Sequence, residues 1–273
     1  MIGFQSGFTQ QEKSGVRYLT IPSFEKAGGA VCAFSTRVGG VSPAPFDTLN
    51  FSRKREKNEA NFQENMRRFA VAAGFDVNSA ISIRYAHGSD LYRAEMKDAG
   101  LGIVRESLPD SCDGLFTDTC GLPIISFHAD CVPLFYYDPI RRAAAVCHAG
   151  WRGTSQHIAK KAVESLLSLG CRPENILAAV GPAISVTNYQ VGADVADIFL
   201  NEFGKDTVRQ IDGHWYVDLP LACAIDMTAL GIKPESITMS DLCTFDREDL
   251  FYSHRRDHGN TGAMAAVIEL LNN

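Results

Sequence analysis

The sequence predicts an α/β or α+β fold in which mixed β-sheets are flanked by helices. Short apolar runs of strand length alternate with amphipathic runs of helix length, but without the strict strand–helix–strand rhythm of an all-parallel sheet. The 273 residues are 45% hydrophobic, which is enough to bury a full core. No repeat, low-complexity tract or long Pro/Gly/Ser linker interrupts the chain, so we expect one domain over residues 1–273.

The first third of the chain contains two predicted strands and one predicted helix. Residues 30–34 form an apolar run that enters the polar turn 36–40, which is typical of a strand end. Residues 59–73 carry apolar side chains at helical spacing, and Gly74 follows as a stop signal. Residues 80–85 predict a short strand that leads to His87.

The remaining elements follow from apolar runs and from glycine or proline breaks. A helix is expected over 154–169, because its apolar residues fall on one face and Gly170 stops it. By the same criteria we expect further helices over 193–203 and 219–230, and strands over 122–128, 133–137, 143–148, 176–180, 237–239 and 263–268.

Charge and cysteine content narrow the function classes. Lys and Arg total 26 against 32 Asp and Glu, and the net charge of −6 argues against non-specific nucleic-acid binding. The N-terminus lacks the pattern of a signal peptide, and no apolar run reaches the length of a membrane span, so we expect a cytoplasmic protein without a membrane partner. The 8 cysteines include no CxxC pair and are expected to be thiols.

Three residues have the chemistry of a metal site. A catalytic zinc ion takes Cys and His ligands from the protein and keeps one position open. His87, Cys131 and His148 each lie next to a turn at the end of a predicted strand, and strand ends meet at a sheet edge. Cys147 is expected to face the opposite way from His148, but His128 can replace a ligand. Single His and Cys residues are more often structural, so the residues alone leave this site open.

Three arginine-bearing turns are candidates for binding an anion. The segment from His148 to Thr154 reads as a strand, a glycine-bearing turn and a helix start, where free N–H groups and Arg152 favour an anion. It lacks the spacing of a P-loop. Turns with Arg37 and Arg255 would complete a phosphate pocket if they converge with Arg152. The alternative is that all three turns are ordinary solvated loops.

Three further side chains are open to two interpretations each. Asp113 is either a general acid/base or a turn former. Trp151 either stacks on a ligand ring or packs in the core. His254 and His258 are four residues apart, which suits a metal only on a helix, and the residues around them favour a loop.

Taken together, these segments resemble the YfiH/YlmD family, also called the laccase-domain or polyphenol oxidase family. The resemblance runs from Thr36 to Gly262, and its most specific part is the pair ADC and HAGWRG. The matching stretches are TRVGGVS with LN, HG, CDGLFTD, ADCVPLFYYD, HAGWRGT, GPAIS with YQVG, VDL, and CTF with FYSHRRD and TG.

The resemblance implies a fold, a metal and a chemistry. It implies a single α/β domain with layered sheets and flanking helices, and zinc held by His87, Cys131 and His148. It implies purine nucleosides and phosphate as substrates, in phosphorolysis of adenosine, inosine and methylthioadenosine and in deamination of adenosine. The chain departs from the family at Tyr85 and Gln190, where Gln and Glu are usual, so substrate preference is the property in doubt.

Within that chemistry the candidate residues receive expected roles. Asp113 is expected to move protons. The residues expected to bind phosphate or the nucleoside are Arg37, Asn50, Trp151, Arg152, Thr154 and Arg255.

Three rival functions remain. Two His and one Cys also form a blue-copper centre, so a copper-dependent polyphenol oxidase is an alternative. The chain has only 7 His and no HxH pair, which makes copper the less favoured metal. A cysteine-type hydrolase of peptidoglycan precursors would use Cys131 as nucleophile and His148 as base. The third alternative is a metal-bound scaffold without activity. The sequence does not predict the oligomeric state.

Overall fold

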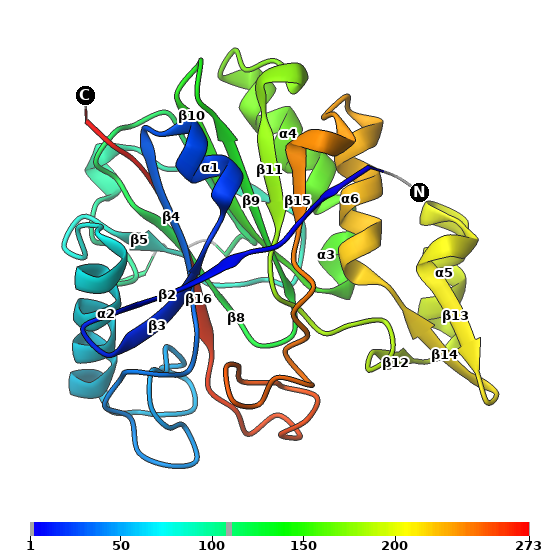
Figure 1. Ribbon diagram of the computed structural model, residues 1–273, viewed down its shortest axis with the longest axis horizontal. Coiled ribbons are helices and arrows are strands. Elements are labelled where there is room, and N and C mark those ends of the chain that lie inside the picture. Colours follow the sequence, from blue (N-terminus) through cyan, green and yellow to red (C-terminus); the bar gives the residue numbers. More distant parts are fainter. Residues whose placement is uncertain (1–2, 108–110, 273) are drawn as a thin grey trace.

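Two large mixed sheets pack face to face and carry helices on their outer faces (Figure 1). The computed structural model describes residues 3–107 and 111–272. One sheet has the order β1 (Gln5–Ser6), β15 (Ile237–Met239), β11 (Leu177–Val180), β9 (Val132–Asp138), β10 (Ala143–Ala149), β7 (Gly114–Thr117), β6 (Leu91–Arg93). The other has the order β2 (Thr9–Lys13), β3 (Val16–Thr20), β4 (Ala30–Ser35), β16 (Met264–Leu270), β8 (Ile124–His128), β5 (Ile81–Ser82).

The strand interiors supply two core layers at once, because successive side chains point to opposite faces of a sheet. In β9, Leu134 and Tyr136 belong to the core beneath the helices, and Phe135 and Tyr137 belong to the core between the sheets. In β10, Cys147 is fully buried in the helix-side core. The alternation therefore turns His148 to the other face, as the sequence predicts.

Helices cover the outer face of each sheet (Figure 1). The seven-stranded sheet carries α4 (Ile158–Ser168) and α6 (Leu219–Ala229), and the six-stranded sheet carries α2 (Glu59–Ala73). The Asn58 side chain caps α2, and Gly74 ends it in the left-handed conformation at φ 88°. The shorter helices are α1 (Pro22–Ala27), α3 (Trp151–Ser155) and the 3₁₀ turns Met96–Asp98, Pro173–Asn175, Lys205–Thr207 and Pro234–Ser236.

A small antiparallel sheet extends from one side of the molecule (Figure 1). It has the order β12 (Gln190–Val191), β14 (His214–Val217), β13 (Val208–Ile211) and packs against α5 (Ala193–Phe203). Tyr189, which directly precedes β12, lines a pocket together with residues at the start of β9 and the end of β10. Across the described ranges, no helix combines the length and hydropathy needed to cross a bilayer.

Most predicted elements are confirmed, but two predictions were wrong. The helix predicted over 154–169 begins at Trp151 and is interrupted at His157, whose φ of 60° is left-handed. His157 Nδ1 lies 3.0 Å from a carboxylate oxygen of Asp226 in α6, which stabilises the break. The strand predicted over 80–85 is limited to Ile81–Ser82, because the chain then leaves the sheet and forms the loop that carries His87.

A buried carboxyl in β16 predicts how stability depends on pH. Glu269 is 7% exposed, and Oε2 has no hydrogen-bond partner among the described residues. Burial raises the pKa of Glu269 above 4.5, so the folded state binds its proton more tightly than the unfolded state. Its stabilising contribution is present below about pH 4.5 and is lost as the pH rises through the raised folded pKa.

We therefore expect Glu269→Gln to gain stability relative to the parent chain as the pH rises. The measurement is chemical denaturation of both proteins at about pH 4 and about pH 8. Glu174→Gln, at an exposed position, is the control and should show no such trend. An equal stability difference at both pH values would contradict the buried-carboxyl explanation.

Candidate metal and substrate site

One pocket lies where β9 begins and β10 ends, and it contains all three predicted metal ligands. Its volume is about 370 Å³. The residues that line it come from five segments of the chain that are distant in sequence: His87, Ala129, Asp130, Cys131, His148, Gly150, Trp151, Arg152, Tyr189, His254 and Arg255.

His148 is a buried side chain near the end of β10. Its Nδ1 lies 3.2 Å from Oδ1 of Asp113, so Nε2 is the ring nitrogen left for other contacts. Its ring packs 4.4 Å from the ring of Tyr85, centroid to centroid. Burial lowers the pKa of His148, but the charge of Cys131 and hydrogen bonding to Asp113 outweigh burial and raise the pKa to about 9.

His87 lies on a loop that Asp113 holds through three backbone bonds. The N–H of Ala86 and that of Gly88 donate to Oδ2 at 3.1 and 2.8 Å, and the N–H of His87 donates to Oδ1 at 3.1 Å. His87 itself has a left-handed φ of 55°, a conformation that costs free energy and persists because these bonds fix the loop. Its ring lies 5.6 Å from the ring of His148, centroid to centroid, and is exposed to the pocket.

The Asp113 carboxylate is fully enclosed and fully bonded. It is 0% exposed, and each oxygen takes part in two of the four contacts just described. Burial raises the pKa of Asp113, but hydrogen bonds from His148 and from the Gly88 N–H outweigh burial and leave the pKa below its ordinary value. The side chain does not line the pocket. Nevertheless, ligand atoms of His87, Asp113 and His148 all lie within 4.8 Å of one another, a group that Cys131 does not join among the described residues. Asp113 is therefore a geometric candidate for the third ligand.

Cys131 lies in the turn between β8 and β9, after Asp130 at a left-handed φ of 81°. A Cβ at position 150 would lie 3.1 Å from Cys131 Sγ, so Gly150 leaves the thiol room. The rival ligand His128 is occupied by other contacts. Its Nδ1 donates to the Cys131 carbonyl at 3.1 Å, and its Nε2 accepts from the Ser126 hydroxyl at 2.7 Å.

Two arginines face the same pocket, each above an aromatic ring. The Arg152 guanidinium lies 4.4 Å from the Trp151 ring centroid, and the Arg255 guanidinium lies 5.0 Å from that of Tyr189. Arg255 also donates to the Gln190 carbonyl at 2.8 Å. These two side chains make one wall of the pocket cationic, and a phosphate is the kind of anion that guanidinium groups bind.

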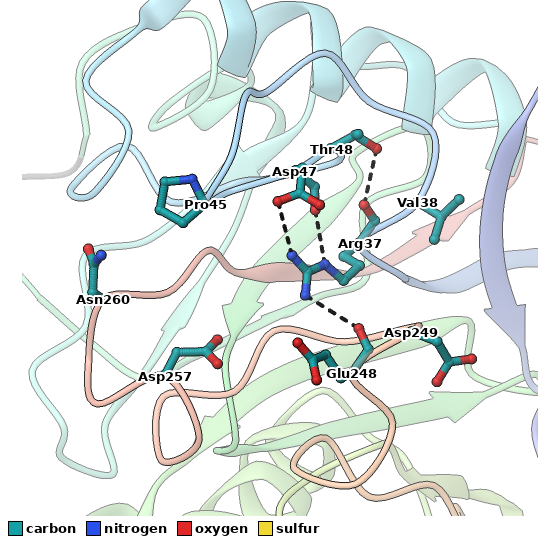
Figure 2. A pocket seen from close by; sticks show the side chains of 9 residues that line it. All are labelled: Arg37, Val38, Pro45, Asp47, Thr48, Glu248, Asp249, Asp257 and Asn260. Carbon is teal, nitrogen blue, oxygen red and sulfur yellow. Dashed lines mark hydrogen bonds and ion pairs between the residues drawn. The ribbon is translucent and has the colours of Figure 1, made fainter.

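The structure does not bring Arg37, Asn50 or Thr154 to this pocket. Arg37 lines a different, acidic hollow, where it donates to the Asp47 carbonyl at 2.9 Å and to that of Glu248 at 3.3 Å (Figure 2). Asn50 is buried, and its Oδ1 accepts from two backbone N–H groups. Thr154 is also buried, and its N–H donates to the Gly150 carbonyl inside the helix that begins at Trp151.

Three pocket residues were missed by the sequence reasoning. Asp130 and Tyr189 lie inside the ADC and YQVG stretches, so the motifs marked them without indicating a role. His254 was considered only as a partner of His258, and the loop expected there is confirmed. The missing signal was the folding of the 253–257 loop against Asp130, which no local pattern reveals.

The model of a family described as multi-copper polyphenol oxidoreductase laccase matches residues 31–271. The chain belongs to this family. Among the laccase-domain proteins, a purine nucleoside phosphorylase of Deinococcus radiodurans is 36% identical, and the match covers 87% of this chain and 88% of the relative. Purine nucleoside phosphorylase YlmD of Bacillus subtilis is 32% identical, and the match covers 87% of each chain.

The fold of the laccase-domain protein described here is also that of a solved relative. The crystal structure of YlmD from Geobacillus stearothermophilus superimposes over the whole of both chains with a TM-score of 0.89 and 32% sequence identity. The predicted family and the predicted layered α/β fold are therefore both confirmed.

A close glycine contact supports the His87 loop and gives a sharp test of it. A Cβ at position 153 would lie 2.4 Å from the Gly88 carbonyl oxygen, whereas a Cβ at position 88 would meet nothing closer than 3.8 Å. We expect Gly153→Ala to displace the loop, to destabilise the fold by about 1–3 kcal/mol and to weaken divalent-metal binding. Gly88→Ala should change both properties far less. Thermal unfolding and metal titration check this, and equal behaviour of the two variants would contradict it.

Proposed function

We propose that this chain is a zinc-dependent purine nucleoside phosphorylase that acts on adenosine, inosine and methylthioadenosine with inorganic phosphate. The observation that carries the proposal is one pocket lined by His87, Cys131 and His148 together with the arginines Arg152 and Arg255. The relatives named as purine nucleoside phosphorylases support it. The direct test is whether inosine and phosphate yield hypoxanthine and ribose 1-phosphate, and whether chelators abolish that yield.

The donor set of the pocket fits a zinc ion. Two imidazoles and a thiol are preferred zinc ligands, and three protein ligands leave one coordination position for a substrate. The hydrogen bond from His148 Nδ1 to Asp113 is the carboxylate contact that commonly orients a metal-binding histidine. When bound, zinc supplies a Lewis acid that polarises an oxygen of the substrate or of phosphate.

We propose Cys131 rather than Asp113 as the third ligand. The Asp113 oxygens already accept three backbone N–H bonds and contact His148, and the side chain lies outside the pocket wall. The Cys131 thiol lines the pocket and is close enough to His148 to shift its pKa. Asp113 then orients both histidines. The earlier expectation that Asp113 moves protons stays a prediction that its burial does not favour.

Four further side chains that line the pocket would hold the two substrates. Arg152 and Arg255 are placed to bind phosphate, and the rings of Trp151 and Tyr189 offer apolar surface to a purine. In phosphorolysis, a phosphate oxygen attacks the ribose C1′ while the C1′–N9 bond breaks. Holding both reactants in one small pocket favours that displacement, because the cost of bringing them together is met by binding.

We also propose that the protein deaminates adenosine. We expect it to be located in the cytoplasm. In deamination, water adds to C6 of adenine and ammonia leaves, so the pocket must admit water instead of phosphate. Copper remains the less favoured metal, since the chain has only 7 His and no HxH pair. Oxidation of a phenolic dye by copper-loaded protein would favour the oxidase alternative.

The ligand set can be tested by replacing zinc with cobalt(II). A thiolate bound to cobalt(II) gives an intense charge-transfer absorption in the near-ultraviolet, which oxygen ligands do not give. We expect the parent chain to show this band and Cys131→Ser to lose it. Asp113→Asn should keep the band while its metal affinity falls roughly 10- to 100-fold. A band that survives in Cys131→Ser and disappears in Asp113→Asn would assign the third ligand to Asp113.

The phosphate wall can be tested by steady-state kinetics. Loss of a charge-assisted contact costs about 1.5–3 kcal/mol. We therefore expect Arg152→Ala to raise the KM for phosphate about 10-fold or more, with a smaller change in the KM for inosine. Arg172→Ala, at an exposed position remote from the pocket lining, is the matched control. An unchanged phosphate KM in Arg152→Ala would reject this role for Arg152.

A further inference from the structure

Cleavage of a purine nucleoside leaves negative charge on the departing base, and the functions assigned above leave that charge without a partner. When the C1′–N9 bond breaks, its electron pair moves into the purine ring. Proton transfer to the ring at that moment lowers the barrier. The group that donates the proton must line the pocket, carry a transferable proton and remain free of other contacts.

Most titratable groups that line the pocket fail these conditions. Asp130 accepts from the Thr244 hydroxyl at 2.6 Å, and its other oxygen accepts two more bonds. Burial raises the pKa of the Tyr189 hydroxyl well above its ordinary value, which makes it a poor acid. Arginines keep their protons at all ordinary pH values. His87, Cys131 and His148 are the proposed zinc ligands. Among the described residues that line the pocket, His254 is the remaining titratable side chain.

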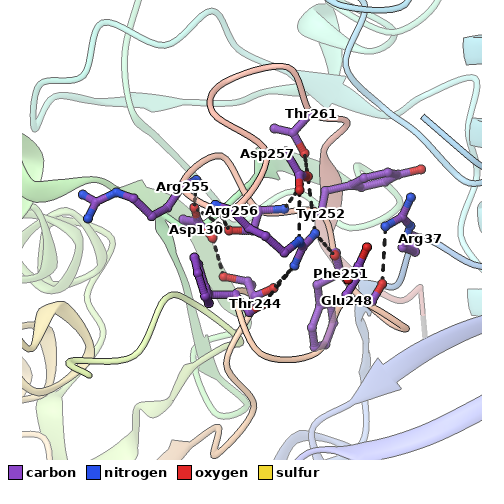
Figure 3. Close-up of polar contacts among 12 residues, drawn as sticks. Arg37, Asp130, Thr244, Glu248, Phe251, Tyr252, Arg255, Arg256, Asp257 and Thr261 are labelled. Carbon is purple, nitrogen blue, oxygen red and sulfur yellow. Dashed lines mark hydrogen bonds and ion pairs between the residues drawn. The ribbon is translucent and has the colours of Figure 1, made fainter. Parts of the chain in front are cut away.

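The backbone of His254 is clamped to the turn that carries Cys131. The residues on either side of His254 both donate to Oδ2 of Asp130. The Arg255 N–H donates at 2.7 Å (Figure 3), and the Ser253 hydroxyl donates at 3.0 Å. The Gly259 N–H donates to the His254 carbonyl at 2.8 Å. Asp130 directly precedes Cys131, so these bonds fix the position of His254 relative to the proposed metal side of the pocket.

Hydrogen bonds from neighbouring side chains stabilise the conformation of the same loop. Arg256 points away from Arg255 and donates to the carbonyls of Thr244 and Phe251, both at 2.9 Å (Figure 3). Asp257 accepts from the Thr261 hydroxyl at 2.8 Å. The loop is therefore rigid where His254 leaves it, although the His254 side chain is exposed.

The imidazole of His254 is free to bind a ligand. Neither ring nitrogen has a hydrogen-bond partner within residues 3–107 and 111–272. Imidazole is the side chain most often used to transfer protons near neutral pH. This contrasts with His128 and His148, whose ring nitrogens make contacts inside the protein.

We propose that His254 is the general acid that protonates the leaving purine, an inference that rests on the phosphorylase function proposed above. A phosphate oxygen forms the new bond to C1′ as the C1′–N9 bond breaks. The imidazolium of His254 gives its proton to N7 of the purine, so that the base leaves neutral. The products are the free purine and ribose 1-phosphate, and solvent returns a proton to the imidazole.

A substrate whose leaving group needs no proton tests this role directly. In 7-methylinosine, the methylated N7 already carries positive charge, so the base leaves neutral without an acid. We expect His254→Asn to lower kcat/KM for inosine roughly 100-fold or more and to leave kcat/KM for 7-methylinosine within about 3-fold of the parent value. His258→Asn, on the same loop but absent from the pocket lining, is the matched control and should match the parent chain on both substrates.

The outcomes separate this inference from the proposed function. If the parent zinc-loaded protein forms no ribose 1-phosphate from inosine, the phosphorylase proposal itself fails. If the parent is active and His254→Asn loses both substrates equally, or loses neither, the general-acid role is overturned. Retained turnover of 7-methylinosine also shows that the variant is folded. Should the parent exclude the methyl group, p-nitrophenyl riboside serves instead, because p-nitrophenolate leaves without a proton.

Discussion

One buried carboxylate, that of Asp113, holds two of the histidines that line the pocket, His87 and His148. It accepts three successive backbone N–H bonds from the loop of His87, and it contacts Nδ1 of His148 on a different strand. A carboxylate placed in the interior costs free energy unless its oxygens are bonded, and here each oxygen has two partners. The same contacts that stabilise the buried charge therefore fix two imidazoles whose rings are 5.6 Å apart.

A second carboxylate, that of Asp130, plays the corresponding part for the other half of the pocket. It joins the Cys131 turn to the loop of His254 and Arg255, which is more than 100 residues further along the chain. Asp113 directly precedes β7, and Asp130 lies in the turn between β8 and β9. The packing of the two sheets thus determines how the walls of the pocket face each other, and the exposed side chains on those walls need few contacts of their own.

How far the sequence predicts this structure depends on how local each feature is. The helices Glu59–Ala73 and Ala193–Phe203 and the strand Ile237–Met239 follow from periodicity and stop signals within a few residues. The convergence of Arg37 with Arg152 failed, since only tertiary packing decides which turns meet. The break at His157 escaped because its partner Asp226 lies in another helix. The polar hairpin strand Thr9–Lys13 has no apolar alternation to reveal it.

The central claim is that His87, Cys131 and His148 share one divalent ion. X-ray absorption at the zinc edge of the metal-loaded protein tests it most directly, because the method measures the ligand atoms around the ion. The account predicts one sulfur at about 2.3 Å and two imidazole nitrogens at about 2.0–2.1 Å, with one lighter ligand completing the shell. A shell of nitrogen and oxygen without sulfur would contradict it and would place the ion on Asp113 or elsewhere.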